Sequence, residues 1–186
     1  AFRQYFRHVT GRGAHELAVW FEADLLPGYA WSFPLPDGRA NVGFGIQRGG
    51  KVSTQEMKDL WPDLLQRDFV RAFLGPDAEP ESPHKAWPIP ARIESATLSG
   101  GDGRVLIVGD AAAATDPMTG EGIGQALLTG RLAAEAILAC GTSGAAAHYE
   151  RAARRELEAD AAMSRLLIRA LKHRKGARAA VRVAGA

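Results

Sequence analysis

The stretch that decides the fold is RVLIVGDAAAATDPMTGEGIGQALLTGRLAAEAILAC, residues 104–140. Its apolar run from Val105 to Val108 is typical of a strand that is buried on both faces of a sheet. Gly109 and Asp110 then place a carboxylate at the end of that strand. Beyond a loop, apolar residues recur at helical spacing, which predicts an amphipathic helix over residues 123–140. The stripe expected to face the core is Ile123, Leu127, Gly130, Ala134, Ile137 and Leu138.

The turn before this helix has the chemistry of a ligand-binding loop. The first amides of a helix have no acceptor within the helix, and the macrodipole adds about half a positive charge there. Gly120, Gly122 and Gly124 carry no side chains, so a flat or anionic ligand can approach those amides closely. Asp110 can accept hydrogen bonds from a ribose or ribityl hydroxyl group. The alternative interpretation is an ordinary strand-to-helix connection, in which the glycines serve turn geometry alone.

Residues 109–137 resemble the second flavin-binding motif of the FAD-dependent reductases and hydroxylases built like p-hydroxybenzoate hydroxylase. Within that superfamily they are most similar to the geranylgeranyl reductase family. The resemblance implies FAD as cofactor, with Asp110 at the ribityl or pyrophosphate region and the helix start facing the N1–C2=O edge of the flavin. It places Pro117, Gly122 and Ile123 against the flavin ring. The cofactor-binding residues implied are Gly109, Asp110, Pro117, Gly120, Gly122 and Ile123.

A second motif lies in residues 27–34, PGYAWSFP. Tyr29, Trp31 and Phe33 share one face of a predicted strand. Such an aromatic stripe is more often core than ligand wall. However, the stretch resembles the P-x-x-Y-x-W-x-F-P signature of geranylgeranyl reductases, with one residue fewer before Tyr29, and this implies a wall of the prenyl-binding cavity. Trp87 begins WPIPAR, which resembles the segment that crosses near the flavin, so it is assigned either to the substrate site or to a packed core.

The rest of the chain predicts an α+β fold. Strands are expected over residues 1–9, 16–21, 29–34 and 40–46, and they form an antiparallel sheet. Ser53 and Glu56 have the spacing of a capping box, which predicts a helix start. A long helix is expected over about residues 145–173. The fold class is thus an antiparallel substrate-side sheet, a strand–turn–helix unit that completes an FAD-binding domain, and C-terminal helices, with segments 1–103, 104–140 and 141–186.

Composition bounds the class of protein. The chain has 186 residues, 46% of them hydrophobic and 24% charged, which suits a globular domain with a sizeable core. A formal net charge of +2 gives no reason to expect nucleic acid. The single cysteine, Cys140, excludes an internal disulfide and fits a reducing cytoplasm. Neither a signal peptide nor a run of about 20 apolar residues is found, and no metal site is expected.

No strand followed by G-x-G-x-x-G occurs in this sequence. Members of the family carry that fingerprint in an N-terminal unit that holds the AMP half of FAD. The resemblance therefore implies that this chain corresponds to the C-terminal portion of such an enzyme. On that basis we expect it to bind FAD weakly and to be inactive by itself.

The function implied by the resemblance is FAD-dependent reduction of C=C bonds in a geranylgeranyl or other polyprenyl lipid. An electron donor, NADPH or a ferredoxin-like protein, is expected as a partner. No catalytic residue is assigned, because the five histidines lie in no recognisable catalytic context.

Two alternatives stay open at this stage. One is an FAD-dependent monooxygenase or halogenase with an aromatic substrate, and the other is a non-catalytic remnant that binds prenyl lipids. Residues 161–186 carry seven Lys or Arg and no Asp or Glu. Such a tail is either a solvated terminus or a peripheral contact with anionic lipid headgroups of a membrane.

Overall fold

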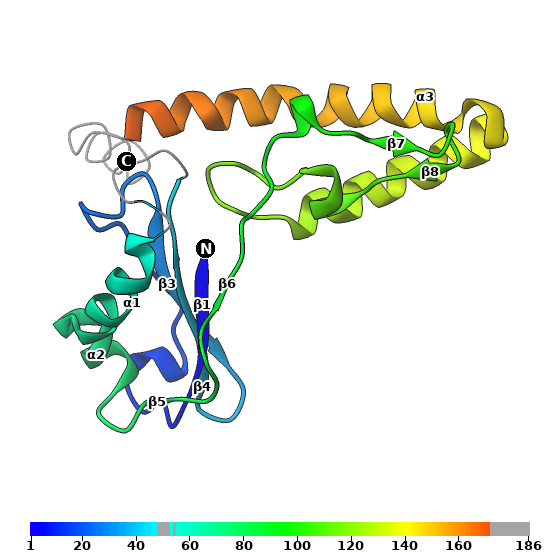
Figure 1. Cartoon of the computed structure of the whole chain (residues 1–186). Coiled ribbons are helices and arrows are strands. Elements are labelled where there is room, and N and C mark those ends of the chain that lie inside the picture. Colours follow the sequence, from blue (N-terminus) through cyan, green and yellow to red (C-terminus); the bar gives the residue numbers. More distant parts are fainter. Residues whose placement is uncertain (48–52, 54, 172–186) are drawn as a thin grey trace, which may run out of the picture. The chain divides into compact units, whose positions relative to one another are not determined.

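The computed structural model of the chain describes residues 1–47, 53 and 55–171. It divides into two compact units, residues 1–88 and residues 89–170 (Figure 1). Its content is mixed α and β, as the sequence predicts. The predicted segments 1–103, 104–140 and 141–186 describe functional parts rather than compact units, and they stay predictions.

The first unit is built on an antiparallel sheet, which confirms the prediction. Its strand order is β2-β3-β4-β1-β5, and β6 also pairs with β1. Asp37 and Gly38 take positive φ angles in the tight turn between β3 and β4. The strands are β1 (Phe2–Arg7), β2 (Ala18–Trp20), β3 (Tyr29–Leu35), β4 (Arg39–Gly45), β5 (Glu79–Pro80) and β6 (Lys85–Ala86).

Two helices, α1 (Glu56–Gln66) and α2 (Asp68–Leu74), pack on one face of this sheet and close its core. The predicted capping box is confirmed, because the Ser53 amide donates to the Glu56 carboxylate at 2.7 Å and the Glu56 amide donates to Ser53 Oγ at 3.2 Å. Trp61 stacks on Phe44 with 5.8 Å between ring centroids. The strand residues of the core are Phe2, Phe6, Ala30, Ala40, Val42 and Phe44.

The second unit is a helical hairpin with a small strand pair. The helix α3 (Ile123–Leu171) breaks at Gly141, where φ is 61° and ψ is −167°, and its second arm turns back along the first (Figure 1). Tyr149 on the second arm is fully buried and donates to the Ile107 carbonyl at 2.6 Å. The unit also contains η2 (Ile93–Ser95), β7 (Ser99–Gly100), β8 (Val105–Leu106) and η3 (Gly109–Ala112).

The prediction that residues 105–108 form a strand buried on both faces is wrong for this structure. β8 has two residues, and Val105 and Val108 are 53% and 36% exposed. Burial on both faces needs flanking strands and a covering layer on each side. Within the residues that the structure describes, β8 pairs only with β7, and only Leu106 and Ile107 pack on the core.

The helix over residues 123–140 is confirmed, but its predicted core stripe is wrong. Ile123, Leu127 and Leu138 are 77%, 72% and 86% exposed. The buried stripe lies on the other side of the arm and is made of Thr129, Leu132, Ala133 and Ala136. Small residues let the second arm of α3 approach closely, so packing selected the alanine-rich side over the side with larger apolar residues.

Length and composition alone make α3 a candidate membrane span, with a window of mean hydropathy 1.3. This differs from the expectation that no such segment occurs. Core helices of soluble proteins can be equally long and apolar, but they are mostly buried. In α3, only 22% of the most apolar stretch is buried. The first arm also carries Arg131 and Glu135, which pair at 2.8 Å. Most of the basic tail lies in residues 172–186, outside the described residues.

Candidate functional site

The loop after β8 is anchored to the first arm of α3 at its first residue. Gly109 has a φ of 58°, and its amide donates to Thr129 Oγ1 at 2.9 Å. A Cβ at Gly109 would lie 3.1 Å from the Ala126 Cβ. Both the backbone conformation and the close approach therefore favour glycine at this position.

Asp110 and Gly122, predicted to act together, lie side by side in this loop. Thr115 Oγ1 donates to Asp110 Oδ1 at 3.1 Å, and a Cβ on Gly122 would lie 3.0 Å from the same oxygen. The Asp110 side chain is exposed, and its Oδ2 has no hydrogen-bond partner among the residues that the structure describes. This carboxylate is thus held at one oxygen and available at the other.

The start of α3 offers fewer free donors than the sequence suggested. The Gly124 amide donates to Glu121 Oε1 at 2.8 Å, so this side chain caps the helix. The amides of Gly122 and Ile123 have no acceptor within the described part of the chain. Gly120 has a φ of 71° and shapes the turn, and Pro117 is half-buried in the same loop. Contact of these residues with a flavin stays a prediction.

Asp116 organises the loop, a role that the sequence analysis did not assign. Its Oδ1 accepts hydrogen bonds from the Met118 amide at 3.0 Å and from the Thr119 amide at 2.7 Å. Its Oδ2 accepts from Ser164 Oγ on the second arm of α3 at 2.6 Å. Burial acts to raise the pKa of Asp116, but the bonds from Ser164, Thr119 and Met118 outweigh it and hold the pKa below the ordinary value. The Asp-Pro-x-Thr turn was a local signal for this residue, whereas Ser164 had none.

We expect Asp116→Asn to lower the free energy of unfolding by about 1.5 kcal/mol near neutral pH, because the charge-assisted bonds are lost. The pKa of Asp116 is lower in the folded than in the unfolded state, so its contribution is full above the ordinary Asp pKa and disappears as the pH falls through the folded value. Urea unfolding of wild type and variant near pH 7 and near pH 3 measures the difference. An equal loss at both pH values would contradict this role.

Tyr29, Trp31 and Phe33 form a continuous row on the first unit, on the face of β3 opposite its core. Ring centroids are 5.9 Å apart for Tyr29 and Trp31, and 6.0 Å apart for Trp31 and Phe33. Their neighbours Ala30 and Ser32 point the other way and are buried. The row is half-buried and is not part of the core cluster, so the interpretation as core does not hold within this unit.

Trp87 is 78% exposed, so it is not packed in a core formed by the described residues of its unit. Its backbone amide donates to the Ala1 carbonyl at 3.0 Å, which fixes the segment beside β1. A role of Trp87 in substrate or flavin contact stays a prediction.

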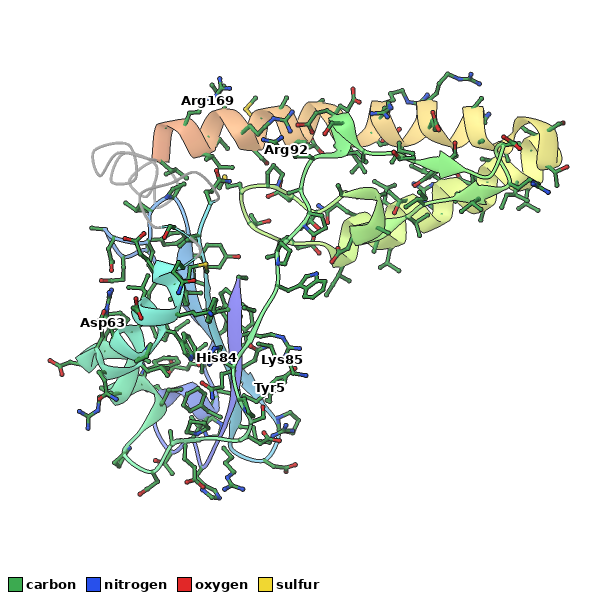
Figure 2. The ribbon with its side chains drawn as sticks, in the orientation of Figure 1. Tyr5, Asp63, His84, Lys85, Arg92 and Arg169 are labelled. Atoms are coloured by element: carbon green, nitrogen blue, oxygen red, sulfur yellow. The ribbon has the colours of Figure 1, made fainter. Side chains whose placement is uncertain are left out.

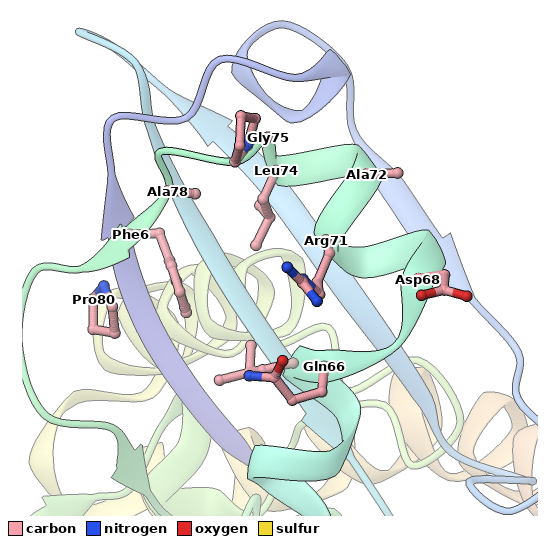
Figure 3. Close-up of a pocket in the computed structure, with 11 residues that line it drawn as sticks. Phe6, Gln66, Asp68, Arg71, Ala72, Leu74, Gly75, Ala78 and Pro80 are labelled. Atoms are coloured by element: carbon pink, nitrogen blue, oxygen red, sulfur yellow. The ribbon is translucent and has the colours of Figure 1, made fainter.

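A pocket of about 560 Å³ lies on the helix-covered side of the sheet, between β1 and α2 (Figure 3). Phe6, Leu74 and Ala78 give it apolar walls. Figure 3 shows the Arg71 side chain extending toward this space and the Asp68 side chain pointing away. The pocket contains none of the residues that the sequence singled out.

No family model matches the chain. A menaquinone reductase of Mycolicibacterium smegmatis is 35% identical over 135 residues, which are 70% of this chain and 30% of that protein. A digeranylgeranylglycerophospholipid reductase of Methanopyrus kandleri is 36% identical over 124 residues, 63% of this chain and 30% of that protein. The corresponding reductase of Methanosarcina mazei is 38% identical over 112 residues, 59% of this chain and 25% of that protein.

A crystal structure of a geranylgeranyl bacteriochlorophyll reductase-like protein from Thermoplasma acidophilum matches with a TM-score of 0.67. The match covers 92% of this chain and 42% of that one, and at 20% identity it shows the fold alone. Among the sequence relatives, the chain spans about 30% of the length of the menaquinone reductase and of the Methanopyrus kandleri reductase. Motifs, relatives and fold agree, and the chain resembles part of the geranylgeranyl reductases.

Proposed function

We propose that the complete gene product containing this chain is an FAD-dependent oxidoreductase that reduces C=C bonds in a geranylgeranyl or other polyprenyl chain. The observation that carries the proposal is the aromatic row of Tyr29, Trp31 and Phe33 on the helix-free face of the sheet. Support also comes from the relatives, several of which are named digeranylgeranylglycerophospholipid reductase.

The row has the chemistry and length that a polyisoprenoid needs. From Tyr29 to Phe33 the strand rises about 13 Å, and ring follows ring along that distance. Burying hydrocarbon against such a wall contributes about 25 cal/mol per Å² and requires no polar partner. A prenyl chain lying along β3 would therefore gain affinity along its length.

The loop of the second unit fits the part of FAD assigned to it. Asp110 Oδ2 is available to accept a hydrogen bond from a ribityl or ribose hydroxyl group. Gly122 leaves the space beside that carboxylate open, and the amides of Gly122 and Ile123 are available as donors. FAD, when bound, would supply the hydride for the C=C bond. The chain's own residues would hold and orient the cofactor.

An electron donor such as NADPH or a ferredoxin-like protein belongs to the same proposal, as does a cytoplasmic location with peripheral membrane contact.

Reduction of a C=C bond consumes no O₂, whereas a flavin monooxygenase requires it. Product analysis under strictly anaerobic conditions tests the proposal, and an absolute requirement for O₂ would contradict it.

We expect Trp31→Ala to raise the KM for a prenyl substrate about tenfold, because the central ring of the wall is lost. Flavin content should be unchanged, and the thermal midpoint should change little because Trp31 is not in the core cluster. The matched control is Trp61→Ala, which removes a core tryptophan that is 3% exposed and should lower stability instead. A destabilised Trp31→Ala variant with normal KM would show that the row is structural.

A further inference from the structure

The pocket between β1 and α2 has walls that are fixed from two sides. At the end of α2, the Leu74 carbonyl accepts hydrogen bonds from the amides of Thr10 and Gly11, both at 3.0 Å. On the opposite wall, Pro80 of β5 pairs with Phe6 of β1. A cavity of about 560 Å³ with such walls lies in the size range of small-molecule sites, which are largely preformed.

The lining of this pocket combines hydrocarbon with one cation. Phe6, Leu74 and Ala78 supply the apolar surface, and the Arg71 side chain extends toward the space beside them (Figure 3). Gln66 adds a neutral carboxamide to the lining. A ligand that complements this lining has an apolar body and an anionic end.

The charge of Arg71 is not used by the protein itself. Arg67, one helical turn earlier, pairs with Asp63 of α1 at 2.8 Å and also with Asp24 (Figure 2 labels Asp63). Asp68 precedes Arg71 by three residues, a spacing at which helix side chains can pair, yet its side chain points away from the pocket. Within the described part of the chain, no oxygen accepts a hydrogen bond from the exposed Arg71 guanidinium.

We propose that this pocket binds a small amphipathic carboxylate, with its carboxylate on Arg71 and its hydrocarbon part against Phe6, Leu74 and Ala78. A guanidinium and a carboxylate match as a bidentate pair, and one cation neutralises one carboxylate. A phosphate monoester carries about two negative charges at neutral pH, so Arg71 would leave it half neutralised. The single cation therefore favours a carboxylate over a phosphate.

This site is separate from the aromatic row. Phe6 and Leu74 belong to the core cluster on the helix-covered face of the sheet, whereas Tyr29, Trp31 and Phe33 lie outside that cluster. The two sites thus use opposite faces of one sheet. The inference goes beyond the proposed function and does not rest on it.

The test measures the binding of octanoate to the complete gene product by calorimetry at low salt. Two reference ligands are 1-octanol, which has a chain of the same length and no charge, and acetate, which has the charge and almost no chain. We expect octanoate to bind about fivefold more tightly than 1-octanol, the upper end for an exposed ion pair. Acetate should bind at least about tenfold more weakly than octanoate, because it buries little hydrocarbon. The preference for octanoate over 1-octanol should decrease as salt is raised.

Two variants test the charge and the cavity separately. Arg71→Gln should lose the preference for octanoate and keep its affinity for 1-octanol. Ala78→Leu enlarges a lining side chain and should weaken the binding of both ligands about tenfold. The matched control is Lys58→Gln, which removes an exposed cation of α1 outside the lining and should keep the full preference. Equal thermal midpoints of wild type and Arg71→Gln without ligand exclude a folding defect.

Equal affinities of wild type for octanoate and 1-octanol would overturn the inference, as would an Arg71→Gln variant that still prefers octanoate. Tighter binding of octyl phosphate than of octanoate would overturn the assignment of the anion. Trp31→Ala should leave octanoate binding unchanged, and a loss in that variant would place the ligand on the aromatic row instead of in the pocket. The proposed function stands in each of these cases, since it is tested by the KM for a prenyl substrate, which Arg71→Gln should not change.

Discussion

Replacing Asp110 with alanine is expected to lower the affinity of the complete gene product for FAD by about 10–150-fold. A charge-assisted hydrogen bond to a hydroxyl group of the cofactor contributes about 1.5–3 kcal/mol, which corresponds to that range. The structure supports the choice of residue, because Asp110 is exposed, is oriented by Thr115 at 3.1 Å and has an oxygen available. The measurement is flavin occupancy after dialysis, together with direct FAD titration of the apoprotein.

Two further variants make this experiment specific. Asp160→Ala removes another exposed carboxylate of the same unit, far along α3, and should leave flavin occupancy unchanged. Gly122→Ala should weaken FAD binding without removing any charge, because the new Cβ would lie 3.0 Å from Asp110 Oδ1 and displace it. Full flavin occupancy in Asp110→Ala would rule out the assigned role, whatever the behaviour of Gly122→Ala.

Features set by neighbours in sequence could be predicted. The alternation in residues 29–34 predicted which side chains of β3 share a face, because strand geometry fixes this within a few residues, but it did not predict which face packs on the core. The capping box at Ser53 and the helix end near Gly141 are likewise local. In the candidate site, the motif over residues 109–122 assigned Asp110 and Gly122 to one cofactor site, and the structure places them side by side.

Features set by distant residues could not be predicted in the same way. Asp116 and Ser164 are 48 positions apart, and no periodicity joins them. The neighbours of Trp31 across the sheet depend on the pairing of β3, β4 and β1, so the sequence alone did not predict them. The burial of β8 depends on which strands flank it, not on its own apolar composition.

The first arm of α3 shows why an apolar stripe alone does not identify a core. Both sides of this arm are apolar, so hydrophobic periodicity allows either side to face inward. The larger residues favoured the side of Leu127, whereas the second arm packs on the side of Leu132. Closeness of approach decided the outcome, because Ala133 and Ala136 let the two arms meet.

This choice of side can be tested with one substitution at two positions. Leu132 is 6% exposed and Leu127 is 72% exposed, and both lie within the first arm of α3. Leu132→Ala should lower the free energy of unfolding by about 2–5 kcal/mol, through lost burial and the cavity left behind. Leu127→Ala should change it by less than about 0.5 kcal/mol.

Leucine and alanine have similar high helix propensities, so each substitution changes the helix propensity by the same small amount. The difference in unfolding free energy between the two variants therefore reports burial alone. Urea unfolding of the 186-residue chain, followed by circular dichroism, measures both. If the side predicted from periodicity were the true core, Leu127→Ala would be the more damaging change. Equal losses at both positions would mean that the arm is buried on both sides, and the exposed stripe of Ile123, Leu127 and Leu138 would then be covered.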